Sequence, residues 1–157
     1  FSTLNYMENK KSYNIVLNSQ QNITSNTNSS IEFGFDWSVI PHGSYNVHFT
    51  FVTNPMNLSS TDVAIININF GSSTVYTAGN LINSYTSDYI GIAKPYLIST
   101  TSYLLSEDNT NPPIYLNNRP NNNIFKVTIN NSTNNALFVP TTGSMANWIL
   151  NLKFIPI

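Results

Sequence analysis

Apolar side chains recur at every second residue in three segments of this chain, residues 31–39, 45–51 and 148–154, and the residues between them are small or polar except for Ile149. In the second segment the apolar phase holds Tyr45, Val47, Phe49 and Phe51, and polar residues occupy the other phase. A two-residue period places successive side chains on opposite faces of a β-strand, so each segment is expected to bury one face and expose the other. The pattern therefore predicts a packed β-sheet protein.

Eight strands are expected along the chain, over residues 12–18, 31–40, 44–53, 62–70, 73–77, part of 89–104, 124–130 and 147–155. The Ser-, Asn- and Thr-rich run 18–30 predicts an exposed loop, and residues 71–73 predict a tight hairpin from 62–70 into 74–77. About eight strands without a helical period indicate a β-sandwich or barrel. The first and last strands both alternate, which suits a jelly roll, where they lie side by side.

The composition favours a protein whose surface is covered by neighbours. The chain has 157 residues, enough for one domain, and only 8% of them are charged, with a formal net charge of −1. Its polarity comes from 27 Asn, 19 Ser and 16 Thr, and covering these side chains costs less desolvation than covering ions. Five Lys and one Arg are too few for a nucleic-acid stripe. No run is long and apolar enough for a membrane span.

The residues capable of chemistry do not converge in the sequence. His42 and His48 are the only histidines, and a hairpin of 31–40 with 44–53 would make Asp36 and His48 cross-strand neighbours. In a jelly roll these two strands belong to opposite sheets, and the pair is separated. The chain lacks cysteine and a GxSxG elbow, so no nucleophile is evident. We therefore expect a protein that is not an enzyme and assign no catalytic residue.

The carboxylates also give no clear site. Glu107 and Asp108 are adjacent in a turn-like segment, whereas a glycosidase needs two acids that face each other across a cleft. Calcium could use these two residues with Asp88, but no EF-hand spacing is present. We assign no cofactor and no metal ligand.

The aromatic residues divide into two groups. Phe33, Phe35, Trp37, Trp148 and Phe154 share the inward phase of their strands and are expected in the core rather than on a sugar-binding platform. A second group lacks a clear phase and is a candidate for an interface: Tyr85, Tyr89, Tyr96, Tyr103 and Tyr115.

Five segments resemble the small single jelly-roll capsid proteins of icosahedral giant (nucleocytoplasmic large) DNA viruses: 13–19 (YNIVLNS), 35–41 (FDWSVIP), 45–52 (YNVHFTFV), 111–120 (NPPIYLNNRP) and 148–157 (WILNLKFIPI). The resemblance implies an all-β single jelly-roll sandwich of about eight antiparallel strands, B to I, in the sheets BIDG and CHEF. In the order of the eight strands expected above, these letters run from B at 12–18 to I at 147–155. The family is structural, so the resemblance implies a minor capsid or penton protein of the virion.

The leading hypothesis is thus a single domain over 1–157 that assembles with other capsid proteins, the major capsid protein and copies of itself, in a viral capsid. The N-terminal arm 1–10 and the long irregular excursion 106–123 are expected to reach neighbours. The expected interface residues are Pro112, Pro113, Tyr115, Arg119 and Pro120. The alternative is a carbohydrate- or receptor-binding β-sandwich module, for which the candidates are Tyr115 with Arg119, or Tyr103 with Glu107 and Asp108.

Overall fold

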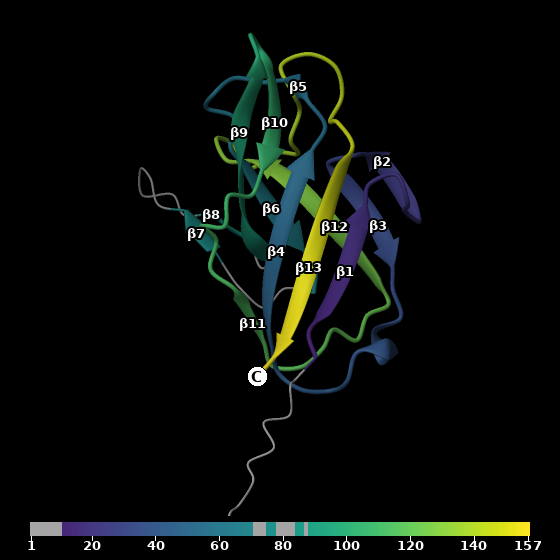
Figure 1. Cartoon of the computed structure of the whole chain (residues 1–157). Coiled ribbons are helices and arrows are strands. Elements are labelled where there is room, and N and C mark those ends of the chain that lie inside the picture. Colours follow the sequence, from purple (N-terminus) through teal and green to yellow (C-terminus); the bar gives the residue numbers. More distant parts are fainter. Residues whose placement is uncertain (1–10, 71–74, 78–83, 87) are drawn as a thin grey trace, which may run out of the picture.

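A computed structural model describes residues 11–70, 75–77, 84–86 and 88–157 of the chain, and nearly all of its regular secondary structure is β-strand (Figure 1). The elements, in chain order, are β1 (Tyr13–Asn18), β2 (Thr24–Thr27), β3 (Ser30–Gly34), the 3-10 turn η1 (Trp37–Val39), β4 (Tyr45–Thr53), β5 (Met56–Asn57), β6 (Ala64–Ile68), β7 (Val75–Thr77), β8 (Ser84–Thr86), β9 (Tyr89–Ser99), β10 (Ser102–Ser106), β11 (Ile114–Leu116), β12 (Ile124–Asn131) and β13 (Trp148–Pro156). The predicted all-β class is confirmed.

Eleven strands join in one antiparallel sheet whose path runs β1-β13-β4-β10-β9-β6-β12-β3-β2, with β11 added to β4 and β5 added to β10. The sheet nearly closes on itself, so that β1, β13 and β4 lie in front of β3, β12 and β6 (Figure 1). The first and last predicted strands are neighbours, since β1 pairs with β13 from Tyr13↔Phe154 to Asn18↔Ile149. The arrangement is consistent with a β-sandwich.

Strand β9 belongs to both halves of the sheet. Its first residues pair with β6, as in Ala93↔Ala64, and its later residues pair with β10, beginning at Lys94↔Ser106 and Pro95↔Leu105. The change of partner falls between Ala93 and Lys94, one residue before Pro95, which has no amide hydrogen to donate to a ladder. One strand therefore carries the chain from one layer into the other.

The inward residues of both layers form one core among the described residues. Strand β4 alternates buried and exposed positions along its whole length. Four of the five predicted core aromatics are buried, and Phe35 is half-buried against the same cluster. Trp37 packs against Phe125 and Phe154 with ring centroids 5.5 and 5.7 Å apart. The core prediction is confirmed for Phe33, Trp37, Trp148 and Phe154.

The predicted strand 31–40 is too long. Strand β3 ends at Gly34, and the chain then turns through η1 because the Asp36 carboxylate accepts a hydrogen bond from the Ser38 amide at 3.0 Å. Trp37 is nevertheless 1% exposed, and its indole N–H donates to the Asn122 carbonyl at 2.9 Å. Alternation located the buried side chains correctly but not the end of the strand.

Two loop predictions are also wrong. The run 18–30 is not entirely loop, because β2 lies within it and pairs with β3 at the outer edge of the sheet. The predicted hairpin after 62–70 does not form, since β6 pairs with β12 and β9 and both its edges are occupied, while β7 pairs with β8. Its expected turn, 71–73, lies outside the described residues.

The excursion 106–123 contains a strand that was not expected. Strand β11 pairs with the beginning of β4, from Ile114↔Val47 to Leu116↔Tyr45. Leu116 is buried and Tyr115 is exposed, so this short piece alternates like the longer strands. The excursion is therefore anchored to the sheet at its middle.

Candidate functional site

Three of the exposed large apolar side chains of the described residues lie on the β9–β10 hairpin. Tyr96, Leu97 and Ile98 have 43%, 61% and 55% of their surface exposed. The hairpin projects beyond the end of the sheet (Figure 1), and its sequence from Pro95 to Ser106 contains no charged residue. Successive strand side chains point to opposite faces, so the hairpin exposes apolar side chains on both of its faces, and exposed apolar groups of this kind are found at contact sites.

The connection between β9 and β10 carries backbone strain. Thr100 has a φ of 39°, a left-handed conformation that is unfavourable for a β-branched residue. Strain at a projecting turn is often retained where it serves a function. The hairpin therefore combines apolar side chains with a turn that the local sequence does not favour.

A second apolar group lies on the outer face of the β1–β13–β4 layer. Ile149 on β13 faces Val52 on β4 in register, and Val16 on β1 is its diagonal neighbour across Asn18↔Ile149. Their exposed fractions are 45%, 44% and 62%. Apart from Lys153 and His48, the outward residues of these strands are uncharged.

The five predicted interface residues differ from one another in how far they are exposed. Pro112, Pro113 and Tyr115 are exposed, Arg119 is half-buried and Pro120 is buried. The Tyr115 hydroxyl lies 3.4 Å from Ser44 Oγ. Pro120 has its surface covered by its own chain, so it offers a partner little contact area.

Arg119 holds the chain together at one end of the sheet. Its guanidinium donates to the Ser38 carbonyl at 3.3 Å and, over a short contact, to the Ile40 carbonyl. A second guanidinium nitrogen lies 2.9 Å from Nε2 of His42, and Asn118 contacts the other ring nitrogen of His42 at 3.3 Å. Arg119 thereby joins the excursion to the turn that precedes β4.

The pair Asp36 and His48 is not assembled. Asp36 caps η1 beyond β3, whereas His48 lies on β4 opposite Lys153 of β13. Hydrogen bonds from the Ser38 side chain and backbone lower the pKa of Asp36, and the Arg119 charge adds to the effect. Asp36 is thus associated with Arg119, a relation that the spacing of the sequence does not indicate.

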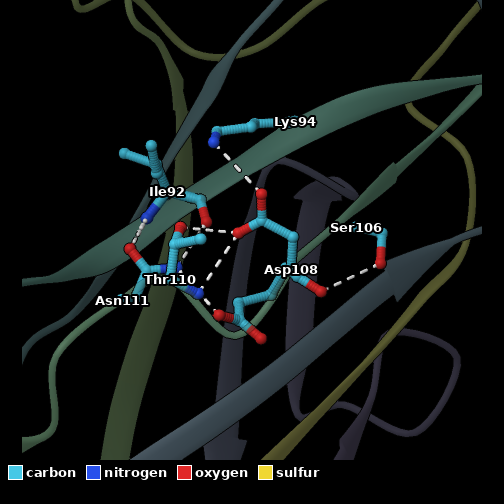
Figure 2. Close-up of polar contacts among 7 residues, drawn as sticks. Ile92, Lys94, Ser106, Asp108, Thr110 and Asn111 are labelled. Carbon is cyan, nitrogen blue, oxygen red and sulfur yellow. Dashed lines mark hydrogen bonds and ion pairs between the residues drawn. The ribbon is translucent and has the colours of Figure 1, made fainter.

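Asp108 is held by contacts within the chain (Figure 2), whereas the neighbouring Glu107 has one bonded carboxylate oxygen and one that is buried without a hydrogen-bond partner among the described residues. Asp108 accepts from the Thr110 hydroxyl at 2.6 Å and from Lys94 Nζ at 3.1 Å, and these contacts lower its pKa. Glu107 is 8% exposed and accepts from the Asn111 amide at 3.1 Å. The Asp108 carboxylate is therefore already paired with the Lys94 ammonium.

The Asn111 side chain ties this cluster to β9. Its amide oxygen accepts from the Ile92 backbone N–H, and its amide nitrogen donates to the Ile92 carbonyl, both at 2.9 Å (Figure 2). The side chain therefore extends the sheet beside β9 as a backbone would. The contacts clamp the start of the excursion to β9 and are structural.

The other unphased tyrosines do not gather at one place. Tyr96 is on the hairpin tip, Tyr103 is half-buried on β10, and Tyr89 begins β9, where burial raises its pKa. The side chain of Tyr85 and the arm 1–10 lie outside the described residues. The alternation analysis missed Leu97 and Ile98, although their adjacency to each other was a visible sign that both faces of the strand are apolar.

Comparison with protein-family models, with curated proteins and with solved structures found no match to this chain. Within the described part of the chain, no helix has the length and hydropathy needed to cross a bilayer.

Proposed function

We propose that the chain is a single jelly roll and a structural subunit of the capsid of a giant DNA virus, either a minor capsid protein or a penton protein. The observation that carries the proposal is the order of strands. With β1 as B, β13 as I, β4 as D and β10 as G, the front layer reads B-I-D-G. With β3 as C, β12 as H, β6 as E and the first part of β9 as F, the other layer reads C-H-E-F.

Two of these letters differ from the assignment that the sequence pattern favours. Under this proposal F is the first part of β9, where 73–77 was expected, and G is β10 alone. With these two strands reassigned, the strand order supports the jelly roll. A fold alone does not define a function, so the surface must supply the second argument.

The surface supports assembly. The tip residues Tyr96, Leu97 and Ile98 and the outer-face group Val16, Val52 and Ile149 supply apolar contacts on two different sides. A specific contact needs about 800 Å² on each partner, and several such contacts per subunit reinforce one another in a closed shell. The uncharged hairpin is the segment best suited to enter a pocket on a neighbouring capsid protein.

The most direct test is the location of the chain in a density map of the intact particle. We expect the two layers to fit a shell position, with the β9–β10 tip in contact with a neighbouring subunit. Absence of the chain from purified virions, judged by mass spectrometry of their proteins, would contradict the proposal.

Variants of the hairpin provide a second test. Replacement of Leu97 and Ile98 by Ser is expected to weaken association of the purified chain with other capsid proteins by at least about tenfold, because apolar contact area is lost. The control replaces Val39 and Val139, which are 63% and 67% exposed elsewhere on the surface, by Ser. If both variants bind equally well in sedimentation velocity, the hairpin does not contribute to the interface.

A further inference from the structure

A polar basin lies where η1, the turn around His42 and the segment 117–123 meet. It encloses about 590 Å³, a volume typical of small-molecule sites. Its walls are rigid because Arg119 joins Ser38, Ile40 and His42, and because the Trp37 indole donates to the backbone of the segment. Half of its fourteen lining residues are neutral polar amides or hydroxyls, and Phe70 contributes a half-buried ring.

Three asparagines of the basin have a fixed orientation. The side-chain oxygens of Asn69, Asn122 and Asn123 accept backbone N–H groups of Lys126, Ile124 and Trp37 at 2.9, 3.2 and 3.4 Å. Since only the amide oxygen accepts, the NH2 group of each must occupy the other position. None of these three NH2 groups has a hydrogen-bond partner among the described residues. Because the backbone N–H groups use the three amide oxygens, the three amide NH2 groups remain available as donors.

The same basin contains an acceptor of fixed charge. Asp36 receives the Ser38 amide on one oxygen, and a carboxylate has about four lone-pair positions in total. The nearby Arg119 offsets its charge, so the basin is close to neutral. A ligand anion would be repelled by Asp36, whereas a ligand hydroxyl can donate to Asp36 and accept from an asparagine NH2.

We infer that this basin binds a neutral polyhydroxylated ligand, namely a sugar residue of a glycan. Each hydroxyl of a sugar ring can both donate and accept a hydrogen bond. Neighbouring hydroxyls can therefore donate to the Asp36 carboxylate and accept from the three asparagine NH2 groups. The C–H face of the ring would lie toward Phe70, the partly exposed aromatic of the basin floor. The site is independent of the shell contacts proposed above, so either can fail without the other.

The test uses Asn122→Asp and Asn123→Asp together. Each change keeps the oxygen that accepts the backbone N–H and removes the donor, so the turn is preserved while the binding group is lost. The matched control is Asn134→Asp, because Asn134 also accepts a backbone N–H, from Ala136 at 3.1 Å, and lies outside the basin. Thermal melting verifies that all three proteins fold, and Asn69→Asp replaces the double variant if that variant does not.

The purified chain is applied to an array of neutral and sialylated glycans, and the terminal sugar of the best-bound glycan is then titrated as its methyl glycoside by calorimetry. We expect saturable binding of a neutral glycan, a loss of affinity of about tenfold or more in the double variant, and an unchanged affinity in the control. Binding of acidic glycans only, binding that the double variant retains, or no binding to any neutral glycan would each overturn the inference.

Discussion

At the scale of single residues, close approach rather than turn geometry makes Gly91 necessary. A Cβ at this position would lie 2.5 Å from the Phe49 ring and 2.6 Å from the Asn111 amide oxygen. Both neighbours are held, Phe49 by the core and Asn111 by two hydrogen bonds to Ile92. Gly91 therefore lets the excursion pack against β9.

We expect Gly91→Ala to lower the free energy of unfolding by about 1–3 kcal/mol, the usual cost of overpacking a core. Gly34→Ala is the control, since its Cβ would meet only the flexible end of Ile23, at 3.0 Å; its effect should stay within about 0.5 kcal/mol. Urea denaturation measures both. An equal loss in the two variants would mean that the clamp around Asn111 is loose.

The carboxylates predict how stability depends on pH. The Thr110 hydroxyl, followed by Lys94, lowers the pKa of Asp108, and Ser38 lowers that of Asp36. Because both folded-state pKa values are depressed, the stabilisation is present above the unfolded value of about 3.9 and is lost as pH falls through the folded values. Burial raises the pKa of Asp88, which acts in the opposite sense.

We therefore expect the melting temperature to fall as pH decreases below about 4. A variant with Asp36→Asn and Asp108→Asn should melt lower at neutral pH and show a smaller fall over the same acidic range. Differential scanning calorimetry from neutral to acidic pH provides the measurement. A fall as steep as that of the unaltered chain would show that other carboxylates control acid unfolding.

At the scale of elements, the β9–β10 hairpin is the least locally favoured connection described. Its pairing shifts between Ser102 and Tyr103, and Thr100 adopts a positive φ. The strain is tolerated because pairing on both sides of the turn, with β5 as a further neighbour of β10, holds the ends together. Tertiary pairing outweighs local preference at this turn.

Thr100→Gly is expected to stabilise the chain by about 0.5–1 kcal/mol, because glycine adopts positive φ without steric cost. Thr101→Gly is the matched control: Thr101 is not among the described residues with positive φ, so this change adds only chain entropy to the unfolded state and should destabilise. Chemical denaturation of the two variants distinguishes the effects. Destabilisation by both would refute strain at Thr100.

At the scale of the whole molecule, the scarcity of charged side chains determines which forces can act in its contacts with other molecules. Six cationic and seven acidic side chains are spread over 157 residues, and the one salt bridge among the described residues joins Lys94 to Asp108. Contacts made by such a surface rest on apolar area and neutral hydrogen bonds. They differ in this respect from electrostatically steered contacts.

The proposed association with capsid partners should accordingly be insensitive to salt. We expect the dissociation constant to change by less than about threefold between about 50 and 500 mM NaCl, since screening affects charged contacts and spares apolar ones. Sedimentation equilibrium at several salt concentrations measures this. Tenfold weakening at high salt would indicate an interface dominated by ion pairs.

The predictable part of the fold is local. Alternation along β4 and β13 predicted which side chains enter the core, because the two-residue period is a property of each strand by itself. It also predicted Trp37 as buried although the backbone there is η1 and not a strand, since burial follows side-chain chemistry. Burial within the predicted interface segment was not predictable: Pro120 is buried there, while Leu97 and Ile98, outside that segment, are exposed.

The sequence by itself determined that this chain is an all-β protein with an aromatic core and a surface poor in charge, because periodicity and composition act residue by residue. Only the tertiary structure decided that β9 serves both layers, that β7 pairs with β8, and that Arg119 joins Ser38, Ile40 and His42 beside one basin. The physical reason is that strand partners are chosen by backbone hydrogen bonds between distant residues. Those bonds are alike for every residue type and leave no mark in the local pattern.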